Sequence, residues 1–167
     1  KHTLDQNEAI KKDELVTSKL KALMEKYNCD RVWVAEFHNG GHTYSGKSFQ
    51  RFSTTYEVVS HGISPEAVNT QNIPTSIFSL FFKKLNEVGY YYTSNVKKTD
   101  DPMSFAMQNF WENKGVSSFL CLSIKDIEGN FVGFLCLDGV INDLSFNKDE
   151  ISKLMLTSSN LAGYLEV

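Results

Sequence analysis

Residues 117–138 read SSFLCLSIKDIEGNFVGFLCLD, and the architecture of the chain follows from them. Two runs rich in leucine, phenylalanine and isoleucine flank the turn Asp126–Asn130, a pattern typical of an antiparallel hairpin. If Cys121 faces Cys136 across this hairpin, side-chain alternation separates the residues into two sets. One face then carries Leu120, Leu122, Ile124, Leu135 and Leu137. The other face carries Ser117, Phe119, Cys121, Ser123, Phe134, Cys136 and Asp138. A slip by one residue mixes the two sets, and composition alone does not exclude it.

A second hairpin is predicted upstream of the first. The run RVWVAEFH, residues 31–38, is rich in valine and aromatic residues and predicts a strand that is buried on both faces for most of its length. The triplet Asn39-Gly40-Gly41 then favours a turn, because glycine adopts positive φ without strain. A loop through Lys47 leads to a second strand over about 49–59.

Helices surround these hairpins. Apolar spacing predicts a helix over 4–27, a second from a Thr75 cap to Leu85, a third from Asp100 to a left-handed cap at Gly115, and a last one opened by residues 146–150. Tyr90–Thr93 predicts a short strand. The order of elements is therefore α-β-β-α-β-α-β-β-α.

This order predicts an α+β fold rather than a doubly wound one. The expected architecture is a central antiparallel sheet of about five to six strands, with the terminal helices on one face and the inserted helices on the other. The first part of the chain is polar, so residues 1–15 are expected to form a helical stalk and residues 16–167 the folded domain. The stalk would either project from the domain or pair with a second copy.

Composition excludes several classes of protein. The chain has 167 residues, 17 Lys and Arg against 20 Asp and Glu, a formal charge of −3 and 41% hydrophobic residues. This fits one soluble domain that does not contact nucleic acid, because a duplex binder needs a basic face. No apolar run approaches the roughly 20 residues of a membrane span. The chain opens on Lys1 rather than Met, which fits either a processed chain or a piece of a longer protein, and the latter leaves room for a membrane anchor upstream.

The three cysteines bear on the compartment. Cys29, Cys121 and Cys136 are odd in number, lie in apolar contexts and lack C-x-x-C spacing, which favours reduced, buried thiols and a cytoplasmic location. If the predicted register holds, Cys121 and Cys136 are cross-strand neighbours that an oxidant could join.

The element order resembles that of the GAF family of sensory domains, over about Leu15 to Leu165. Two stretches carry the resemblance: the closing unit from Gly115 through the helix after Phe146, and the opening unit DRVWVAEFHNGG, residues 30–41. The FHNGGH run, residues 37–42, is similar to a signature of uncharacterised, often membrane-anchored GAF-like proteins common in phage genomes. The rest of that signature is matched by Gly46, Lys47, Ser48, Phe52, Ser53, Tyr56 and Glu57.

The resemblance implies a function class but no ligand. A GAF-like domain implies a small-molecule-sensing or regulatory module, whose pocket is roofed by the helices between the hairpins. The Asn-Lys-Phe-Asp-Glu set of cyclic-nucleotide-binding members is not recognisable, and no cysteine sits where a linear tetrapyrrole would attach. The cysteine spacing also differs from that of the free methionine sulfoxide reductases. No catalytic constellation is recognised, so we expect no enzyme, and the cofactor is unknown. The alternative is a structural or homodimerisation module of a phage or bacterial protein that binds no ligand.

Two groups of residues are candidates for a ligand site. The first is polar and surrounds the upstream hairpin, because Glu36 and His38 point to the same face of their strand and the glycine loop follows. Its members are Glu36, His38, Asn39, His42, Lys47, Ser53, Tyr56 and Glu57. Several of them also fit a satisfied structural network that fixes the loop, since buried polar groups must find partners. The second group is apolar and suits a planar or apolar molecule, or else a core that it fills completely. Its members are Met107, Trp111, Phe119 and Cys121.

Other kinds of site have less support. His38, His42 and either Glu36 or His61 are acceptable zinc ligands, but their spacing fits no standard site, so no metal is expected. The Asn39-Gly40-Gly41 run with Lys47 lacks the strand-to-helix context of a phosphate-binding loop.

A homodimer through the terminal helices is the expected assembly. Its candidate contact residues form apolar stripes at helical spacing on the first and last helices. They are Leu20, Leu23, Tyr27, Ile151, Met155 and Ala162.

Overall fold

A single antiparallel sheet forms the centre of the molecule. The computed structural model describes residues 5–42, 48–98 and 105–165. The strands are β1 (Arg31–His42), β2 (Ser48–Val59), β3 (Ile73–Pro74), β4 (Tyr90–Thr93), β5 (Ser118–Lys125) and β6 (Phe131–Gly139). They form a 6-stranded sheet in the order β3-β2-β1-β6-β5-β4. The pairing of β1 with β6 therefore joins the two predicted hairpins at the middle of the sheet.

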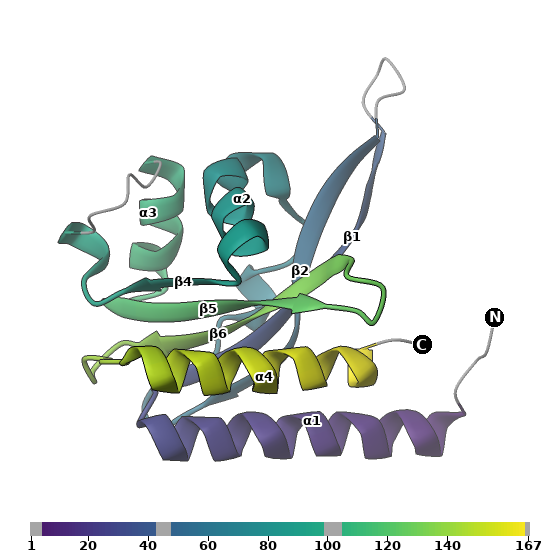
Figure 1. Cartoon of the computed structure of the whole chain (residues 1–167), viewed down its shortest axis with the longest axis horizontal. Coiled ribbons are helices and arrows are strands. Elements are labelled where there is room, and N and C mark those ends of the chain that lie inside the picture. The colour runs from purple at the N-terminus through teal and green to yellow at the C-terminus, as the bar shows by residue number, and fades with distance from the viewer. Residues whose placement is uncertain (1–4, 43–47, 99–104, 166–167) are drawn as a thin grey trace.

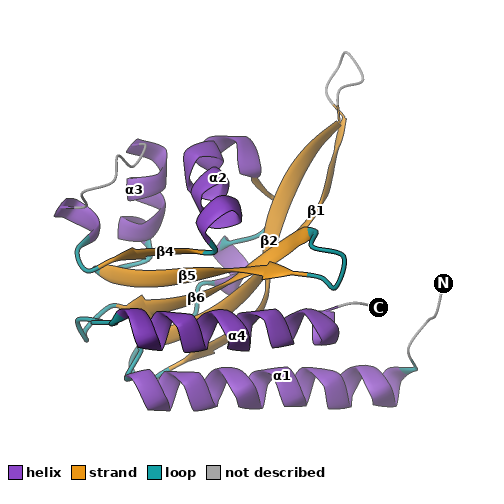
Figure 2. Cartoon of the chain, viewed as in Figure 1, coloured by secondary structure: helices purple, strands orange, loops and turns teal. Residues whose placement is uncertain are grey.

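Helices cover both faces of this sheet. The α-helices are α1 (Gln6–Tyr27), α2 (Ser79–Val88), α3 (Phe105–Asn113) and α4 (Lys148–Leu165), with short 3₁₀ turns η1 (Ala67–Asn69), η2 (Thr75–Phe78) and η3 (Val96–Lys98). Figure 1 shows α1 and α4 side by side on one face, and α2 and α3 on the other. The orange strands in Figure 2 lie between these two helical layers. This arrangement confirms the predicted α+β layout.

The two faces of the sheet bury different kinds of side chain. Cys121 lies opposite Cys136, so the register expected from the sequence is confirmed. What we call the aliphatic face lies under α1 and α4 and comprises Val32, Val34, Val58, Leu120, Leu122, Ile124, Leu135 and Leu137. What we call the aromatic face lies under α2 and α3 and comprises Trp33, Ala35, Phe52, Tyr91, Phe119, Cys121, Phe134 and Cys136.

Side-chain caps fix where the two terminal helices begin. The Asp5 carboxylate accepts the Glu8 backbone N–H at 2.8 Å at the start of α1. At the start of α4, Asn147 and Glu150 cap reciprocally: each side chain accepts the other's backbone N–H, at 2.8 and 3.0 Å. Such a capping box satisfies two amides that the helix leaves free.

Three local predictions differ from the structure. β1 continues to His42 instead of turning at residues 39–41, and Figure 1 shows its hairpin with β2 extending beyond the body of the domain. Thr75 does not cap α2, because it opens the turn η2 and its hydroxyl donates to the Gln50 carbonyl at 3.3 Å. The predicted helix start at Asp100 lies outside the described residues, whereas the end of α3 is followed by Gly115 at φ 75°, as expected.

Within the described part of the chain, every helix is too short or too polar to span a membrane.

Candidate functional site

The aromatic face supplies the floor of the candidate site. A row of directly paired residues crosses the sheet there: Glu57, Trp33, Cys136, Cys121 and Tyr91. From the opposite side, α2 contributes Phe81, Phe82 and Leu85, and α3 contributes Met107 and Trp111. The two predicted residues on α3 and the two on β5 therefore do meet, as the second candidate group requires.

Ring stacking closes this site. The Trp111 ring stacks on Phe119 with centroids 4.1 Å apart and contacts Trp33 at 5.8 Å. A cavity of about 10 Å³ remains, lined by Phe52, Phe78, Phe81, Met107, Phe110, Trp111 and Phe134. That space holds about one water molecule. The aromatic side chains themselves therefore fill the volume beneath α3.

A disulfide joins β5 and β6 on the floor of the site. Cys121 and Cys136 are bonded, with Cα atoms 4.2 Å apart. The expectation of reduced thiols is therefore wrong for these two residues, because the register sets them directly opposite each other. Cys29 is free and buried, and desolvation raises the pKa of its thiol.

A buried ionic cluster lies at one end of the aromatic face. Arg31 at the start of β1 and Asp138 near the end of β6 are both fully buried, and Arg31 Nη1 lies 3.1 Å from Asp138 Oδ2. The Trp33 indole N–H donates to the same carboxylate oxygen at 3.0 Å. Arg31 Nη2 also donates to the carbonyls of Ser64 at 3.0 Å and Lys114 at 3.3 Å. Two strands and two loops are therefore tied to one guanidinium.

Glu57 extends this cluster onto β2. Its carboxylate lies 3.9 Å from Arg31 Nε and accepts the backbone N–H groups of Glu66 and Ala67 at 2.9 to 3.1 Å. Glu57 is the polar candidate whose side chain contacts this ionic cluster among the residues that the structure describes.

Lys114 completes the cluster from the end of α3. Its Nζ lies 3.7 Å from the Trp33 ring centroid, 5.0 Å from that of Phe110 and 5.3 Å from that of Trp111. Only 6% of the residue is exposed. Burial lowers the pKa of Lys114 to about 8, against the opposing attraction of Asp138. Burial also raises the pKa of Asp138, while Lys114 and Arg31 lower it.

Some buried polar atoms of this region are unpaired. Within residues 5–42, 48–98 and 105–165, Arg31 Nε, Asp138 Oδ1 and Trp111 Nε1 are buried atoms of this region that have no hydrogen-bond partner. Buried polar atoms in folded proteins are nearly always hydrogen-bonded, so each exception requires an explanation.

The remaining polar candidates lie elsewhere. Glu36 and His38 alternate with Phe37, whose ring packs with the aromatic face, so they point to the opposite side of the sheet. His38 Nε2 lies 2.8 Å from Ser53 Oγ, and Ser53 Oγ accepts the Asn72 backbone N–H at 2.9 Å. These bonds hold the β1–β2 hairpin to the segment before β3. They match the structural network that the sequence also allowed.

The rest of the polar group is similarly dispersed. Asn39 accepts a hydrogen bond from Gln50 Nε2 at 3.1 Å, and the Tyr56 hydroxyl donates to Asp13 of α1 at 2.7 Å. Burial raises the pKa of Tyr56, and Asp13 adds to this effect. His42 ends β1, its side chain lies outside the described part, and Lys47 lies outside the described residues altogether. Across the described ranges, no group of three metal-ligating side chains gathers.

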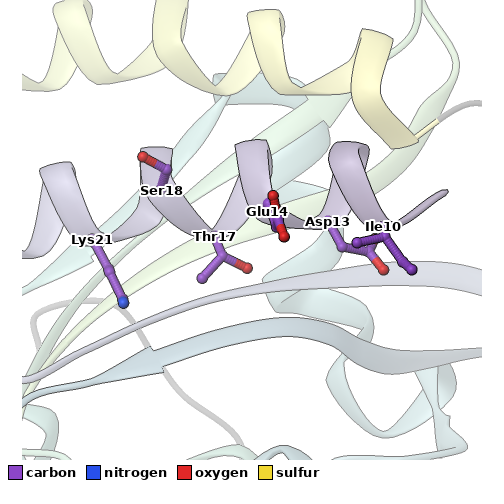
Figure 3. A pocket seen from close by; sticks show the side chains of 6 residues that line it. All are labelled: Ile10, Asp13, Glu14, Thr17, Ser18 and Lys21. Atoms are coloured by element: carbon purple, nitrogen blue, oxygen red, sulfur yellow. The ribbon is translucent and has the colours of Figure 1, made fainter. Parts of the chain in front are cut away.

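Most of the predicted dimer residues lie in the core of this chain. Leu20, Leu23, Ile151 and Ala162 are buried against the aliphatic face, and Tyr27 and Met155 pack against the same core. A separate open groove of about 460 Å³ lies on α1. Figure 3 shows that its lining side chains all come from that helix. They are Ile10, Asp13, Glu14, Thr17, Ser18 and Lys21.

The sequence did not identify Arg31 or Lys114 as site residues. It predicted the correct face of the sheet for Asp138 but no function for its carboxylate. One signal was present: Arg31 and Asp138 are charged, yet each directly adjoins a strongly apolar run. A charge at such a position is expected to be paired, because burying it alone is costly.

The comparisons with known proteins identify the fold. No family model matches the sequence, and no curated protein matches it. The blue-light-absorbing form of the Thermosynechococcus elongatus PixJ GAF domain is similar in structure, with a TM-score of 0.74 and 16% identity over 98% of this chain and 90% of that one. A phycocyanobilin-bound GAF domain from a cyanobacterial phytochrome gives a TM-score of 0.68 and 14% identity over 97% and 94%. A GAF domain/HD domain protein from Geobacter sulfurreducens gives a TM-score of 0.67 and 10% identity over 97% of this chain and 96% of that one. The chain therefore has a GAF-like α+β fold along nearly its whole length.

Proposed function

We propose that the chain is a sensory or regulatory module that responds to a small molecule bound on the aromatic face, between the sheet and helices α2 and α3. The observation that carries this proposal is the pair of buried polar atoms, Asp138 Oδ1 and Trp111 Nε1, without a partner among the described residues. An unpaired buried polar atom costs about 1–3 kcal/mol, so a core that serves packing alone avoids it. Polar groups of a ligand would supply the missing partners.

The similar structures support this class of function. One of them binds phycocyanobilin and another is the blue-light-absorbing form of a GAF domain. In those proteins the fold therefore serves small-molecule binding or light absorption. At 14% and 16% identity, neither ligand nor chemistry is carried over to this chain.

Binding beneath α3 requires this helix to move. The cavity beneath α3 is about 10 Å³, whereas ligand pockets commonly measure roughly 300–1,000 Å³. Trp111 and Met107 are the buried residues of α3, so displacing them from the sheet opens the site. The ligand would thus favour an open state over the closed one described above.

The sheet offers a route from this site to the terminal helices. On β5, Phe119 contacts Trp111, whereas its neighbours Leu120 and Leu122 belong to the core beneath α1 and α4. Ser158 of α4 also donates to the β5 carbonyl of Ser123 at 2.8 Å. A shift of β5 would therefore change the packing of α4.

A packed scaffold that forms homodimers is the second candidate. The filled volume beneath α3 favours it, and so do exposed apolar residues on the terminal helices: Ile10 at 46%, Leu15 at 45% and Leu156 at 69%. In such a dimer the contact residues would be these exposed side chains instead of the buried residues that the sequence predicted.

A thermal-shift screen separates the two candidates. We would test linear tetrapyrroles, nucleotides, amino acids and small amines, since a ligand at about 100 times its Kd stabilises by about 2.7 kcal/mol, or roughly 5–10 °C. Trp111→Phe, which removes the indole N–H, should reduce the shift. Phe105→Leu on the same helix should keep it, because Phe105 is 80% exposed.

The scaffold has its own signature in the same experiment. If no class of compound shifts the melting temperature, and Leu156→Lys converts a dimer into a monomer by light scattering, the sensory proposal fails.

A further inference from the structure

We propose that the cage of Trp33, Phe110 and Trp111 is a binding site for the ammonium group of a small organic cation, and that Lys114 is its built-in competitor. This inference rests on the proposed function, because it names the ligand class for the same face of the sheet. In the structure described here, the Lys114 ammonium itself occupies this site.

The cage has the geometry that cations favour. Lys114 Nζ lies 3.7, 5.0 and 5.3 Å from the ring centroids of Trp33, Phe110 and Trp111. A cation within about 6 Å of an aromatic centroid is attracted by the negative face of the ring, most strongly for Trp. The rings come from β1 and α3, so an ammonium group between them contacts both sides of the site. Aromatic cages of this kind suit quaternary and primary ammonium groups.

A buried carboxylate supplies the counter-charge. Asp138 Oδ2 accepts the indole N–H of Trp33, the nearest ring to Nζ, while Oδ1 has no hydrogen-bond partner among the described residues. Arg31 and Lys114 together balance Asp138 and Glu57 in formal charge. A ligand cation that displaces Lys114 preserves this balance, whereas an anion or a neutral molecule does not.

The competitor is able to leave. Lys114 directly follows the last residue of α3 and precedes Gly115, which adopts the left-handed φ of 75° that ends the helix. In the part of the chain that the structure describes, its Nζ makes ring contacts but no hydrogen bond or ion pair. Displacing it therefore breaks no directed bond of the side chain.

Competition predicts a particular pH dependence. The charged groups that act on Lys114 are Arg31 on β1, Glu57 on β2, Asp138 on β6 and Glu66 after β2. Because burial lowers the pKa of Lys114 to about 8, the cage holds the neutral amine more firmly than the ammonium, so the competitor is retained more strongly as the pH rises from 7 to 9. A quaternary ammonium keeps its charge throughout, so its binding should weaken as the pH rises.

Intrinsic fluorescence provides a direct measurement. The chain has two tryptophans, Trp33 and Trp111, and both belong to the cage. We would titrate the whole chain with choline chloride at pH 7 and pH 9, with 3,3-dimethylbutan-1-ol as the neutral molecule of matched shape. The expected result is a saturable change with choline alone and an apparent Kd about tenfold higher at pH 9, since the protonated fraction of the caged Lys114 falls from about 0.9 to about 0.1 and its release into water then takes up a proton.

Two variants test the role of Lys114. Lys114→Ala removes the competitor and should bind choline more tightly than wild type, with a gain about tenfold larger at pH 9 than at pH 7 and little remaining pH dependence. Lys114→Arg keeps a permanent charge and should bind weakly at both pH values. If Lys114→Ala does not fold alone, recovery of its folded circular dichroism signal by tetramethylammonium chloride, but not by sodium chloride, supports the proposal equally.

The outcomes separate this inference from the function on which it rests. An equal response to choline and its neutral analogue, or no response to choline in wild type at pH 7, overturns the cation site. If a tetrapyrrole or a nucleotide then stabilises the chain in the thermal-shift screen, the sensory function stands without it. If no compound does, both proposals fail.

Discussion

The aliphatic and aromatic faces of the sheet are built from the same strands but bury different chemistry. Beneath α1 and α4 the side chains are valine, leucine and isoleucine. Beneath α2 and α3 lie stacked rings, a disulfide and the Arg31–Asp138–Lys114 cluster. Alternation along one strand therefore assigns two tasks: Leu120 and Leu122 of β5 hold helices, whereas Phe119 and Cys121 form the candidate site. The aliphatic face needs only volume and shape, while the aromatic face depends on charge and direction.

The largest effect should come from breaking the ionic cluster. Asp138→Ala leaves Arg31 and Lys114 without their buried carboxylate, so we expect a loss of about 3–5 kcal/mol in the free energy of unfolding. Urea unfolding at pH 7, followed by far-ultraviolet circular dichroism, measures it. Native tryptophan emission should also change, because Trp33 donates to this carboxylate.

Leu137→Ala is the matched control for Asp138→Ala. The two residues are adjacent on β6 but lie on opposite faces, and Leu137 is fully buried. Its truncation should cost about 2–5 kcal/mol through a cavity, with native tryptophan emission unchanged. A cost below about 1 kcal/mol for Asp138→Ala would contradict the assignment of a tightly coupled cluster.

Reduction of the disulfide should come next in size. Cys121 and Cys136 are 15 residues apart, and a cross-link closing a loop of that length contributes about 3 kcal/mol. Urea unfolding with and without dithiothreitol gives the difference, and Cys121→Ala/Cys136→Ala should be insensitive to the reductant. Thiol titration of the unfolded, unreduced chain should find one reactive thiol, Cys29; three would show that the bond does not form.

Replacing the buried ammonium should raise stability. The pKa of Lys114 lies at about 8 instead of 10.5, equivalent to roughly 3 kcal/mol of unfavourable burial for the charged form. Lys114→Met removes that cost but also loses ring contacts, so we expect a net gain of about 1–2 kcal/mol at pH 7. Lys21→Met, an exposed position on α1, should change stability by less than about 0.5 kcal/mol.

The same pKa fixes a pH dependence. Between the native value of about 8 and the ordinary value of 10.5, the unfolded state binds more protons at Lys114, so its contribution to stability rises with pH. Above pH 9, Cys29 acts oppositely because burial raises the pKa of its thiol. We therefore expect the free energy of unfolding of wild type to increase relative to that of Lys114→Met between pH 8 and 9. Parallel stability curves for the two proteins would contradict this.

The smallest effect is expected at the polar hairpin. His38→Ala removes the contact with Ser53 Oγ, so we expect a loss of about 0.5–1.5 kcal/mol. Because Glu36 and His38 face away from the aromatic side, ligand-induced changes in tryptophan emission should be retained. If a folded His38→Ala protein lost those changes, the polar residues of the β1–β2 hairpin would have to take part in ligand binding.

The features that could be predicted from the sequence are those set by local residue patterns. Alternation gave the two faces of β5 and β6, and the Asn147–Glu150 spacing indicated the start of α4. It could not give the pairing of Arg31 with Asp138, because these residues are 107 positions apart and meet only through the β1–β6 pairing. Nor could it give the closed cavity: whether Trp111 lies over Phe119 or leaves a pocket depends on side-chain packing that residue spacing does not specify.

The central pairing of β1 with β6 also has a kinetic consequence. Strand pairs this distant in sequence form slowly, because the entropy of closing a long loop is lost before the contacts between the strands can offset it. β1 is synthesised before β6 and acquires this inner neighbour only once β6 is complete. Arg31 and Trp33 therefore remain without Asp138 until β6 has been synthesised, and a chain truncated before β6 exposes an apolar strand edge that can pair with other chains.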